Sequence, residues 1–199
     1  IAGFVPYQHG SITLEGQRVT GPGAERGVVF QNEGLLPWRN VQDNVALGLQ
    51  LAGVDKAQRR QAAAQMLKKV GLEGAEKRFI WQLSGGQRQR VGIARALAAN
   101  PQVLLMDEPF GALDPVTREA LQQEMIRIHR LLGRTIVLVT HDIEEALLLC
   151  ERVLVMSPRP GRIIAEFALP LDFPRHRDNP QLLQHRQDIL RILGQEADW

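Results

Sequence analysis

The sequence predicts an α/β fold built on a parallel sheet, with a block of helices inserted into it. Two short apolar runs, VLLM at residues 103–106 and TIVLV at 135–139, lie between turn residues and have the pattern of strands buried in a parallel sheet. Capped helical patterns follow both runs. This alternation is typical of a doubly wound fold, and a helical stretch from residue 32 to 100 interrupts it.

The N-terminal part of the chain favours β structure. The segment SITLEGQRV alternates apolar and polar side chains, a turn rich in glycine and proline follows, and the apolar run VVF ends at Gln31. The pattern then becomes helical. Asn40 or Asp43 caps a first helix, Asp55 caps the helix KAQRRQAAAQMLKKV, and Gly71 is suited to end that helix.

The second half of the chain alternates helices and strands. Asp114 and Pro115 are suited to begin a helix, as a capping carboxylate followed by proline at the first helical position. DIEEALLLC predicts the next helix, and RVLVMS and GRIIAEF predict strands joined by the turn PRPG. Asn179 and Pro180 open a last amphipathic helix, which runs through LLQHRQDILRIL.

The composition is that of a globular protein. Of the 199 residues, 44% are hydrophobic and 23% are charged, and no apolar stretch reaches the roughly 18 residues that span a bilayer. The net charge is +2 and the basic residues form no single block, so nucleic-acid binding is not favoured. The single cysteine, Cys150, lies in an apolar run and fits a buried thiol in a reducing cytosol.

The pattern divides the chain into a core and a helical insert. We expect an α/β core formed by residues 1–31 and 101–199, a helical subdomain at 32–100, and a C-terminal helical tail at 175–199. The chain begins IAGFVPYQHG, with neither a methionine nor a secretory signal. We therefore expect it to be a fragment of a longer protein.

Residues 83–87 read LSGGQ and predict an anion site. Ser84 is a good N-cap, and Gly85 and Gly86 let the backbone approach a ligand closely. The helix that follows directs its free N–H groups and its positive end towards this turn. An ordinary helix capped by serine is the alternative for these five letters, so the motif needs support from elsewhere in the chain.

That support comes from polar residues at the ends of two predicted strands. Asp107 and Glu108 follow VLLM, at the edge of the sheet where α/β folds bind ligands. Asp107 suits a Mg²⁺ ion held through water, and Glu108 suits a base for a water molecule that attacks a phosphate. His141 follows the next strand and adds a third polar group. Solvated acids at a strand end are the alternative for Asp107 and Glu108.

Together these motifs resemble the ATP-binding subunits of ABC transporters, over essentially the whole chain. The resemblance implies a P-loop NTPase core with a parallel sheet, an antiparallel β edge and an inserted helical subdomain. It identifies LSGGQ as the signature motif, Asp107 as the Walker B aspartate and Glu108 as the catalytic glutamate. Ala112, Leu113 and Asp114 correspond to the D-loop, His141 to the switch histidine, and Gln31 to the Q-loop glutamine, which joins Asp107 as a metal ligand.

One motif of the family does not occur among these residues. The chain contains no Gly-Lys-Ser or Gly-Lys-Thr, so the phosphate loop G-x-x-x-x-G-K-[ST] is missing, as is the aromatic residue on which adenine stacks. Two cassettes of the family pack head to tail, and each signature motif covers the ATP of its partner. The resemblance implies that Ser84, Gly86 and Gln87, beside Gly85, contact the γ-phosphate of a partner's ATP, that Asp114 aligns the interface, and that these residues alone do not hydrolyse ATP.

The resemblance extends to one group of importers. FQNEGLLPWRNVQDNVALGLQLAG and EEALLLCERVLVMSPRPGRI are similar to the taurine, sulfonate and nitrate importer ATPases, and the first stretch favours taurine. The segment ALPLDFPRHRDNPQLLQHRQDILRIL is closer to the general sulfonate and nitrate group, so a nitrate or other alkanesulfonate importer stays open. An inactive remnant that only dimerises is a further alternative. The compact helical insert disfavours a soluble ATPase associated with nucleic acid or ribosomes.

An importer ATPase of this family works in a membrane complex. The resemblance implies ATP and Mg²⁺ as cofactors, a second ATPase subunit packed head to tail, integral-membrane permease subunits, a periplasmic solute-binding protein reached through the complex, and no nucleic acid. The chain is then expected at the cytoplasmic face of the inner membrane, as a peripheral subunit. The apolar cluster LLPW at residues 35–38 lies where the family receives the permease, and packing of the helical block onto the core explains it equally.

Overall fold

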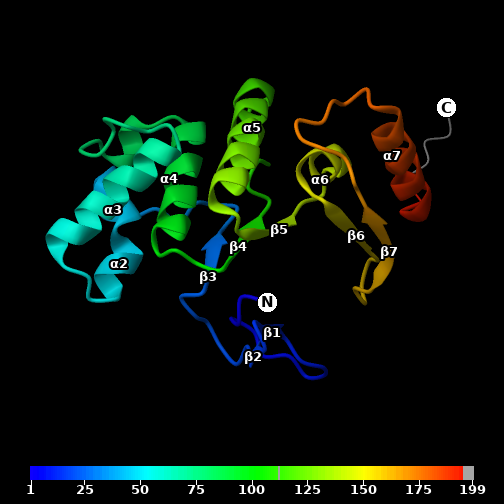
Figure 1. Ribbon diagram of the computed structural model, residues 1–199, viewed down its shortest axis with the longest axis horizontal. Coiled ribbons are helices and arrows are strands. Elements are labelled where there is room, and N and C mark those ends of the chain that lie inside the picture. The colour runs from blue at the N-terminus through cyan, green and yellow to red at the C-terminus, as the bar shows by residue number, and fades with distance from the viewer. Residues whose placement is uncertain (112, 195–199) are drawn as a thin grey trace. The chain divides into compact units, whose positions relative to one another are not determined.

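The computed structural model describes residues 1–111 and 113–194, which fall into two compact units (Figure 1). The first unit comprises residues 1–139, and the second begins at Thr140. The boundaries expected at residues 31 and 100 both fall inside the first unit and stay predictions. Of the tail expected at 175–199, residues 195–199 lie outside the described part. Within the described residues, no helix is both long and apolar enough to span a bilayer.

A three-stranded parallel sheet forms the centre of the first unit. Its strands are β3 (Arg26–Val29), β4 (Val103–Asp107) and β5 (Thr135–Val139), in that order across the sheet. The central strand β4 pairs in parallel register with both neighbours. Leu104 and Met106 of β4 are buried, as the apolar run predicted. The parallel sheet and the buried central strand are therefore confirmed.

Strand β5 is less buried than its sequence predicted. Thr135 and Val139 are exposed, and the three residues between them are only half-buried. The reason is the position of the strand, because β5 lies at the edge of this sheet and pairs on one side only, with β4. The prediction of a parallel strand at these residues was correct, and the prediction that both its faces are covered was wrong within this unit.

The helices of the first unit begin where their capping residues predicted. Asn40 rather than Asp43 caps the first one, since its Oδ1 accepts a hydrogen bond of 2.7 Å from the Asp43 amide. Asp55, Ser84 and Asp114 cap three others. The helices are α1 (Val41–Val45), α2 (Leu47–Leu51), α3 (Lys56–Lys69), a 3-10 helix (Ile80–Gln82), α4 (Gly85–Ala98) and α5 (Pro115–Leu132). Gly71, with φ 70°, follows α3 as expected.

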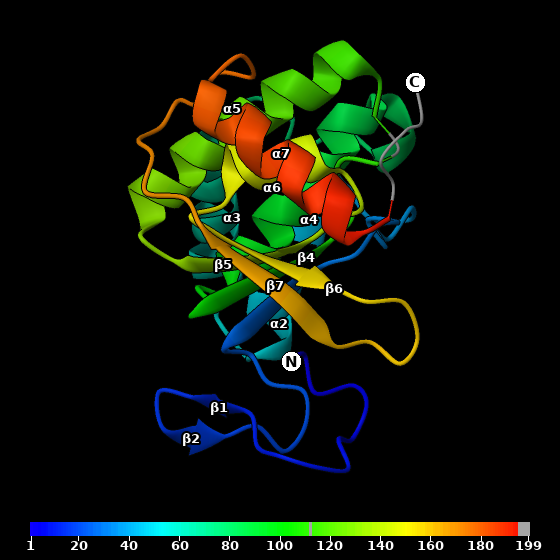
Figure 2. The same cartoon turned by 90° about the vertical axis from the view of Figure 1, so that its right-hand side faces the viewer.

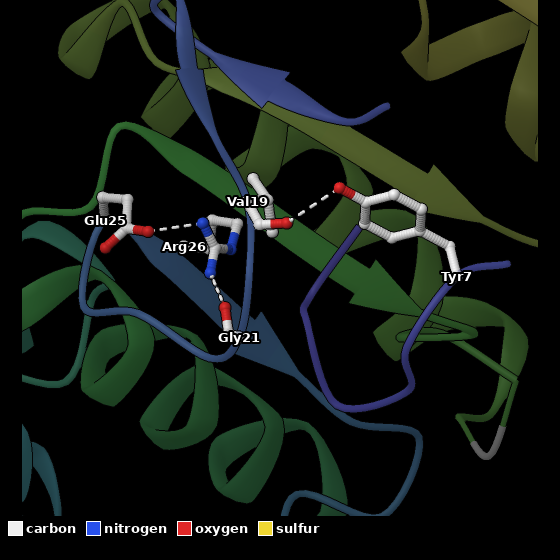
Figure 3. A network of polar contacts seen from close by, with 5 residues as sticks. All are labelled: Tyr7, Val19, Gly21, Glu25 and Arg26. Atoms are coloured by element: carbon white, nitrogen blue, oxygen red, sulfur yellow. Dashed lines mark hydrogen bonds and ion pairs between the residues drawn. The ribbon is translucent and has the colours of Figure 1, made fainter. Parts of the chain in front are cut away.

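The N-terminal segment is tied to the start of β3. A hairpin of β1 (Thr13–Leu14) and β2 (Gln17–Arg18) turns at Glu15 and Gly16, both with positive φ. It lies apart from the parallel sheet in both views (Figure 1, Figure 2). The Arg26 guanidinium donates to the Gly21 carbonyl and to the Glu25 carboxylate, and the Tyr7 hydroxyl donates to the Val19 carbonyl at 3.3 Å (Figure 3). These bonds hold the chain that enters the sheet.

The second unit is a small α/β cluster. It contains α6 (Ile143–Leu149), the antiparallel strands β6 (Arg152–Met156) and β7 (Ile163–Ala168), and α7 (Pro180–Ile192). Both the hairpin and the last helix are as predicted. The core of this unit is small and apolar, and consists of Leu147, Val155, Leu169, Leu182 and Ile189. Because this core is small, we expect polar contacts to contribute a large share of the stability of the second unit.

The largest of these polar contacts is made by Arg175, which sequence reasoning did not single out. Its buried guanidinium donates to four backbone carbonyls, at 2.6 to 3.2 Å, and lies 4.3 Å from the centre of the Phe173 ring. The carbonyls belong to Leu147, Cys150, Leu169 and Leu171. Two of them lie at the end of α6, where helical carbonyls lack partners within the helix. Burial raises the pKa of the Cys150 thiol to about 11.

We expect Arg175→Met to destabilise the second unit by about 2–4 kcal/mol, because buried carbonyls lose donors that methionine does not replace. The measurement is urea unfolding of the chain, followed by circular dichroism. Arg177→Met is the matched control, since Arg177 makes an exposed ion pair with Glu144 at 3.7 Å, and we expect a change below about 0.5 kcal/mol. Equal unfolding midpoints for the two variants would contradict this account of the second unit.

Candidate functional site

The end of strand β4 carries two of the predicted site residues. Asp107 is the last residue of β4 and is exposed, and Glu108 after it is half-buried. Glu108 has φ 43°, in the left-handed region that residues other than glycine seldom adopt. Its amide donates to the Val139 carbonyl at the end of β5, at 2.9 Å. This conformation holds Glu108 at the edge of the sheet, and such backbone outliers gather at functional sites.

Gln31 and Glu108 lie together, although 77 residues separate them in the chain. The Gln31 Nε2 atom donates to the Glu108 Oε2 atom at 2.9 Å. The two residues come from adjacent parallel strands, since Gln31 follows β3 and Glu108 follows β4. The bond orients one carboxylate oxygen of Glu108 and leaves the carboxylate at the edge of the sheet, where a general base would stand.

The oxygen ligands here fit a Mg²⁺ ion only in part. Asp107 offers an exposed carboxylate, and the Gln31 amide offers an oxygen as well as the nitrogen that binds Glu108. In the part of the chain that the structure describes, no three His, Cys, Asp or Glu side chains gather closely enough to hold a metal. Mg²⁺ keeps several waters and needs few protein ligands when phosphates supply the others. The residues therefore suit a nucleotide-bound ion rather than a metal site formed by protein alone.

The signature segment LSGGQ begins helix α4 with a reciprocal cap. The Ser84 Oγ atom accepts from the Gln87 amide at 3.3 Å, and the Ser84 amide donates to the Gln87 Oε1 atom at 3.0 Å. Sequence reasoning predicted the Ser84 cap but not the part played by Gln87. Ser84 is exposed, Gly85 and Gln87 are half-buried and Gly86 is buried, so Ser84 is the part of this helix start that is most open to an anion.

Helix α4 begins directly against the start of α5. A Cβ atom placed on Gly86 would lie 2.3 Å from the Thr117 Cγ2 atom, so only glycine allows this approach without a shift of Thr117. Asp114 caps α5 by accepting from the Thr117 amide at 3.0 Å. Hydrogen bonds from the side chain and the backbone of Thr117 hold the pKa of Asp114 below its usual range. The signature segment and Asp114 are thus neighbours, while Ala112 lies outside the described residues.

His141 belongs to the second unit, where it precedes α6. Next to it, Asp142 caps this helix by accepting from the Glu145 amide at 3.1 Å, and the Asp142 amide donates to the Thr140 hydroxyl at 3.0 Å. This geometry places His141 on an ordered turn. Its approach to Glu108 stays a prediction.

Two residues that sequence reasoning missed bind the backbone of the segment that follows Gln31. Arg95 of α4 donates to the carbonyls of Glu33 and Gly34, just after Gln31. Asn44 of α1 is fully buried, and its side chain bonds to the backbone of Leu36, Arg39 and Asn40. Both residues interrupt apolar runs, in GIARALAA and in VQDNVALGL. A polar side chain on the apolar face of a predicted helix is the signal that could have revealed them.

The chain is similar to known ATP-binding proteins of transporters. A profile of the family described as "ABC transporter" matches residues 1–111. The taurine import ATP-binding proteins TauB of Escherichia coli O157:H7 and of strain K12 are each 62% identical over 208 aligned positions, which cover 100% of this chain and 81% of each relative.

Solved structures show the same likeness. CbiO1 from Clostridium perfringens, described as part of the ABC transporter complex cbiONQ, has a TM-score of 0.78 at 26% identity, over 96% of this chain and 74% of that one. The ATP-binding cassette MJ0796, a dimer in a post-hydrolysis state bound to ADP and Pi, has a TM-score of 0.68 at 33% identity, over 82% of this chain and 75% of that one. With the family profile and the identity over its whole length, the chain belongs to the ABC transporter family, as an ATPase domain.

Proposed function

We propose that this chain belongs to the ATPase of an importer for taurine or a related sulfonate. The observation that carries the proposal is the pair of Gln31 and Glu108, joined at 2.9 Å across two strand ends in the segment that the family profile matches. The choice of solute rests on the 62% identity to proteins named as taurine import ATP-binding proteins. A nitrate or other alkanesulfonate importer is the alternative.

In this proposal Glu108 is the base for the water that attacks the γ-phosphate. Its backbone is fixed by the bond to Val139, and its carboxylate is oriented by the amide of Gln31. Asp107 and Gln31 hold Mg²⁺, which when bound neutralises charge on the phosphates. His141 completes the set as a polar contact to the γ-phosphate.

We further propose that LSGGQ serves an ATP molecule held by a second cassette. Ser84, Gly85, Gly86 and Gln87 then contact its γ-phosphate, at the start of α4 where Ser84 is exposed, and Asp114 lies at the same interface. The close approach of Gly86 to Thr117 supports this, because it brings the signature segment and the D-loop side by side. The related cassette solved as a dimer with ADP and Pi supports the same arrangement.

The complex that we propose also contains a permease, at the cytoplasmic face of the inner membrane, and a periplasmic solute-binding protein. Trp38 is 71% exposed, although the loop that carries it is held by the buried side chain of Asn44. An exposed tryptophan on an ordered loop is typical of a protein contact. This supports docking of the permease at residues 35–38 over simple packing, which would bury Trp38.

The role of Glu108 is tested in a completed cassette, in which a phosphate-loop segment precedes Ile1. We expect Glu108→Gln to lower kcat for ATP at least about 100-fold, because the amide cannot accept the proton of the attacking water. Binding of ATP is expected to stay within about 2-fold, because no interaction with the ground state is removed. Glu73→Gln is the control, as Glu73 makes an exposed surface pair with Lys68. Retained turnover in Glu108→Gln would exclude Glu108 as the base.

The shared site is tested by mixing two forms of the protein. We expect the 199-residue chain to hydrolyse no ATP alone, because it contains no phosphate-loop lysine. We expect a completed cassette with Ser84→Ala to be weakly active, and addition of the 199-residue chain to restore its turnover, because the chain supplies an intact LSGGQ. The measurement is phosphate release. Turnover by the chain alone, or no gain on mixing, would contradict the shared site.

The transported solute is tested in vesicles that contain the completed cassette with the permease and the solute-binding protein of a taurine importer. We expect labelled taurine to accumulate in an ATP-dependent manner, and taurine with its binding protein to stimulate ATP hydrolysis by about 10-fold. Nitrate and a longer alkanesulfonate are compared in the same assay. Uptake of nitrate without uptake of taurine would favour the alternative.

A further inference from the structure

Arg95 of helix α4 makes an unusual contact with the chain that follows Gln31. Its Nη1 atom donates to the Gly34 carbonyl at 2.7 Å, and its Nη2 atom donates to the Glu33 carbonyl. The planar fork of a guanidinium suits two neighbouring acceptors, and lysine cannot reproduce it. One side chain therefore fixes two successive peptide groups of a segment that lies 61 residues away in sequence.

The environment of Arg95 indicates that this contact is more than a surface bond. Arg95 is half-buried, and this burial lowers the pKa of its guanidinium. The two carbonyls supply hydrogen-bond acceptors to a charged group that has lost part of its water, so loss of either bond would be costly. Helix α4 also approaches the same segment one turn earlier, where a Cβ atom placed on Gly92 would lie 3.4 Å from the Glu33 Cβ atom.

Helix α4 connects this contact to the signature segment. It begins at the Ser84 cap and reaches Arg95 after three turns, about 16 Å along its axis. Buried residues along the helix, among them Val91, Ile93 and Ala94, anchor it in the helical block. Because a packed helix moves as a rigid element, a displacement of Ser84 is carried to Arg95, and from there to the backbone at residues 33 and 34.

The segment that Arg95 binds leads to the proposed catalytic residues. Gln31 lies two residues before Glu33, and its amide holds the Glu108 carboxylate at 2.9 Å. Gly34 has φ 57°, so the chain turns sharply where Arg95 holds it. Without the two bonds from Arg95, the turn at Glu33 and Gly34 could shift and Gln31 could move away from Glu108. The bonds from Arg95 prevent this movement.

We propose that Arg95 is a positioning residue for ATP hydrolysis, which ties the place of Gln31 to that of the helix that begins at Ser84. The inference rests on the proposed function of Gln31 and Glu108 and adds a residue that touches neither nucleotide nor water. Engagement of the signature segment by a partner's ATP then sets the Gln31–Glu108 geometry in the same subunit through the guanidinium of Arg95.

The first test is local and needs no activity. In the 199-residue chain, we expect Arg95→Met to raise hydrogen–deuterium exchange of the peptide that covers residues 32–40, because the turn loses its two bonds. Arg59→Met is the matched control, since Arg59 donates to the Val54 carbonyl at 3.2 Å, within the helical block and outside residues 32–40. Unchanged exchange in Arg95→Met would overturn the proposal, whatever the ATPase activity.

The second test is kinetic and uses the completed cassette. We expect Arg95→Met to lower kcat at least about 10-fold with KM for ATP nearly unchanged, because misplaced catalytic groups slow the chemical step without weakening ground-state binding. Arg95→Lys is expected to restore part of the loss, and Arg59→Met to show none. A loss in KM alone, or an equal loss in both variants of Arg95 and in Arg59→Met, would overturn the role.

A double-mutant cycle separates positioning through Gln31 from a general loss of structure. If Arg95 acts through Gln31, adding Arg95→Met to Gln31→Ala costs less than about 2-fold further in kcat. Full additivity of the two losses would overturn the proposal. Should Arg95→Met fail to fold, the same cycle with Arg95→Lys decides. If the wild-type cassette shows no turnover that depends on Glu108, the proposed function itself fails, and the exchange experiment still judges the contact of Arg95.

Discussion

The pairing of strand β4 with both of its neighbours is the constraint on which the first unit depends. β4 is the only central strand among those described in this sheet, and its apolar side chains are buried. Because β3 and β5 run parallel to it, all three strands end at the same edge. Gln31 and Glu108 meet there by topology rather than by sequence proximity, which is why parallel sheets bind ligands beyond their carboxyl ends.

Helix caps perform two tasks in this protein. Ser84 and Asp114 each satisfy backbone N–H groups at the start of a helix, and both stand in motifs that we propose to lie at a nucleotide. The cap fixes the backbone of the motif, so the stability of the helix and the geometry of the proposed site have the same source. Elsewhere the chain relies on side chains that bind carbonyls, namely the buried Asn44 and Arg175 and the half-buried Arg95.

The sequence was sufficient for the strands, most helix starts and the residues of the motifs, because these depend on local pattern. The caps at Asp55 and Asp114 and the buried run in β4 needed only neighbouring residues, whereas the choice between Asn40 and Asp43 needed the structure. The half-exposed β5 was not predictable, because its burial depends on what pairs beyond it. The hydrogen bonds of Arg95 to the carbonyls of Glu33 and Gly34 join segments that are distant in the sequence. The sequence alone could not identify these partners, because they come together only in the fold.

The contact of Gly86 with Thr117 has a consequence for how this protein can evolve. Any side chain at position 86 displaces the Thr117 methyl group, and rotation of this β-branched side chain removes its hydroxyl from Asp114. Two motifs that are separate in the sequence are therefore under a single steric restriction. A substitution of Gly86 would thus disturb the Asp114 cap of α5, so change in one motif is restricted by the other, whatever either of them binds.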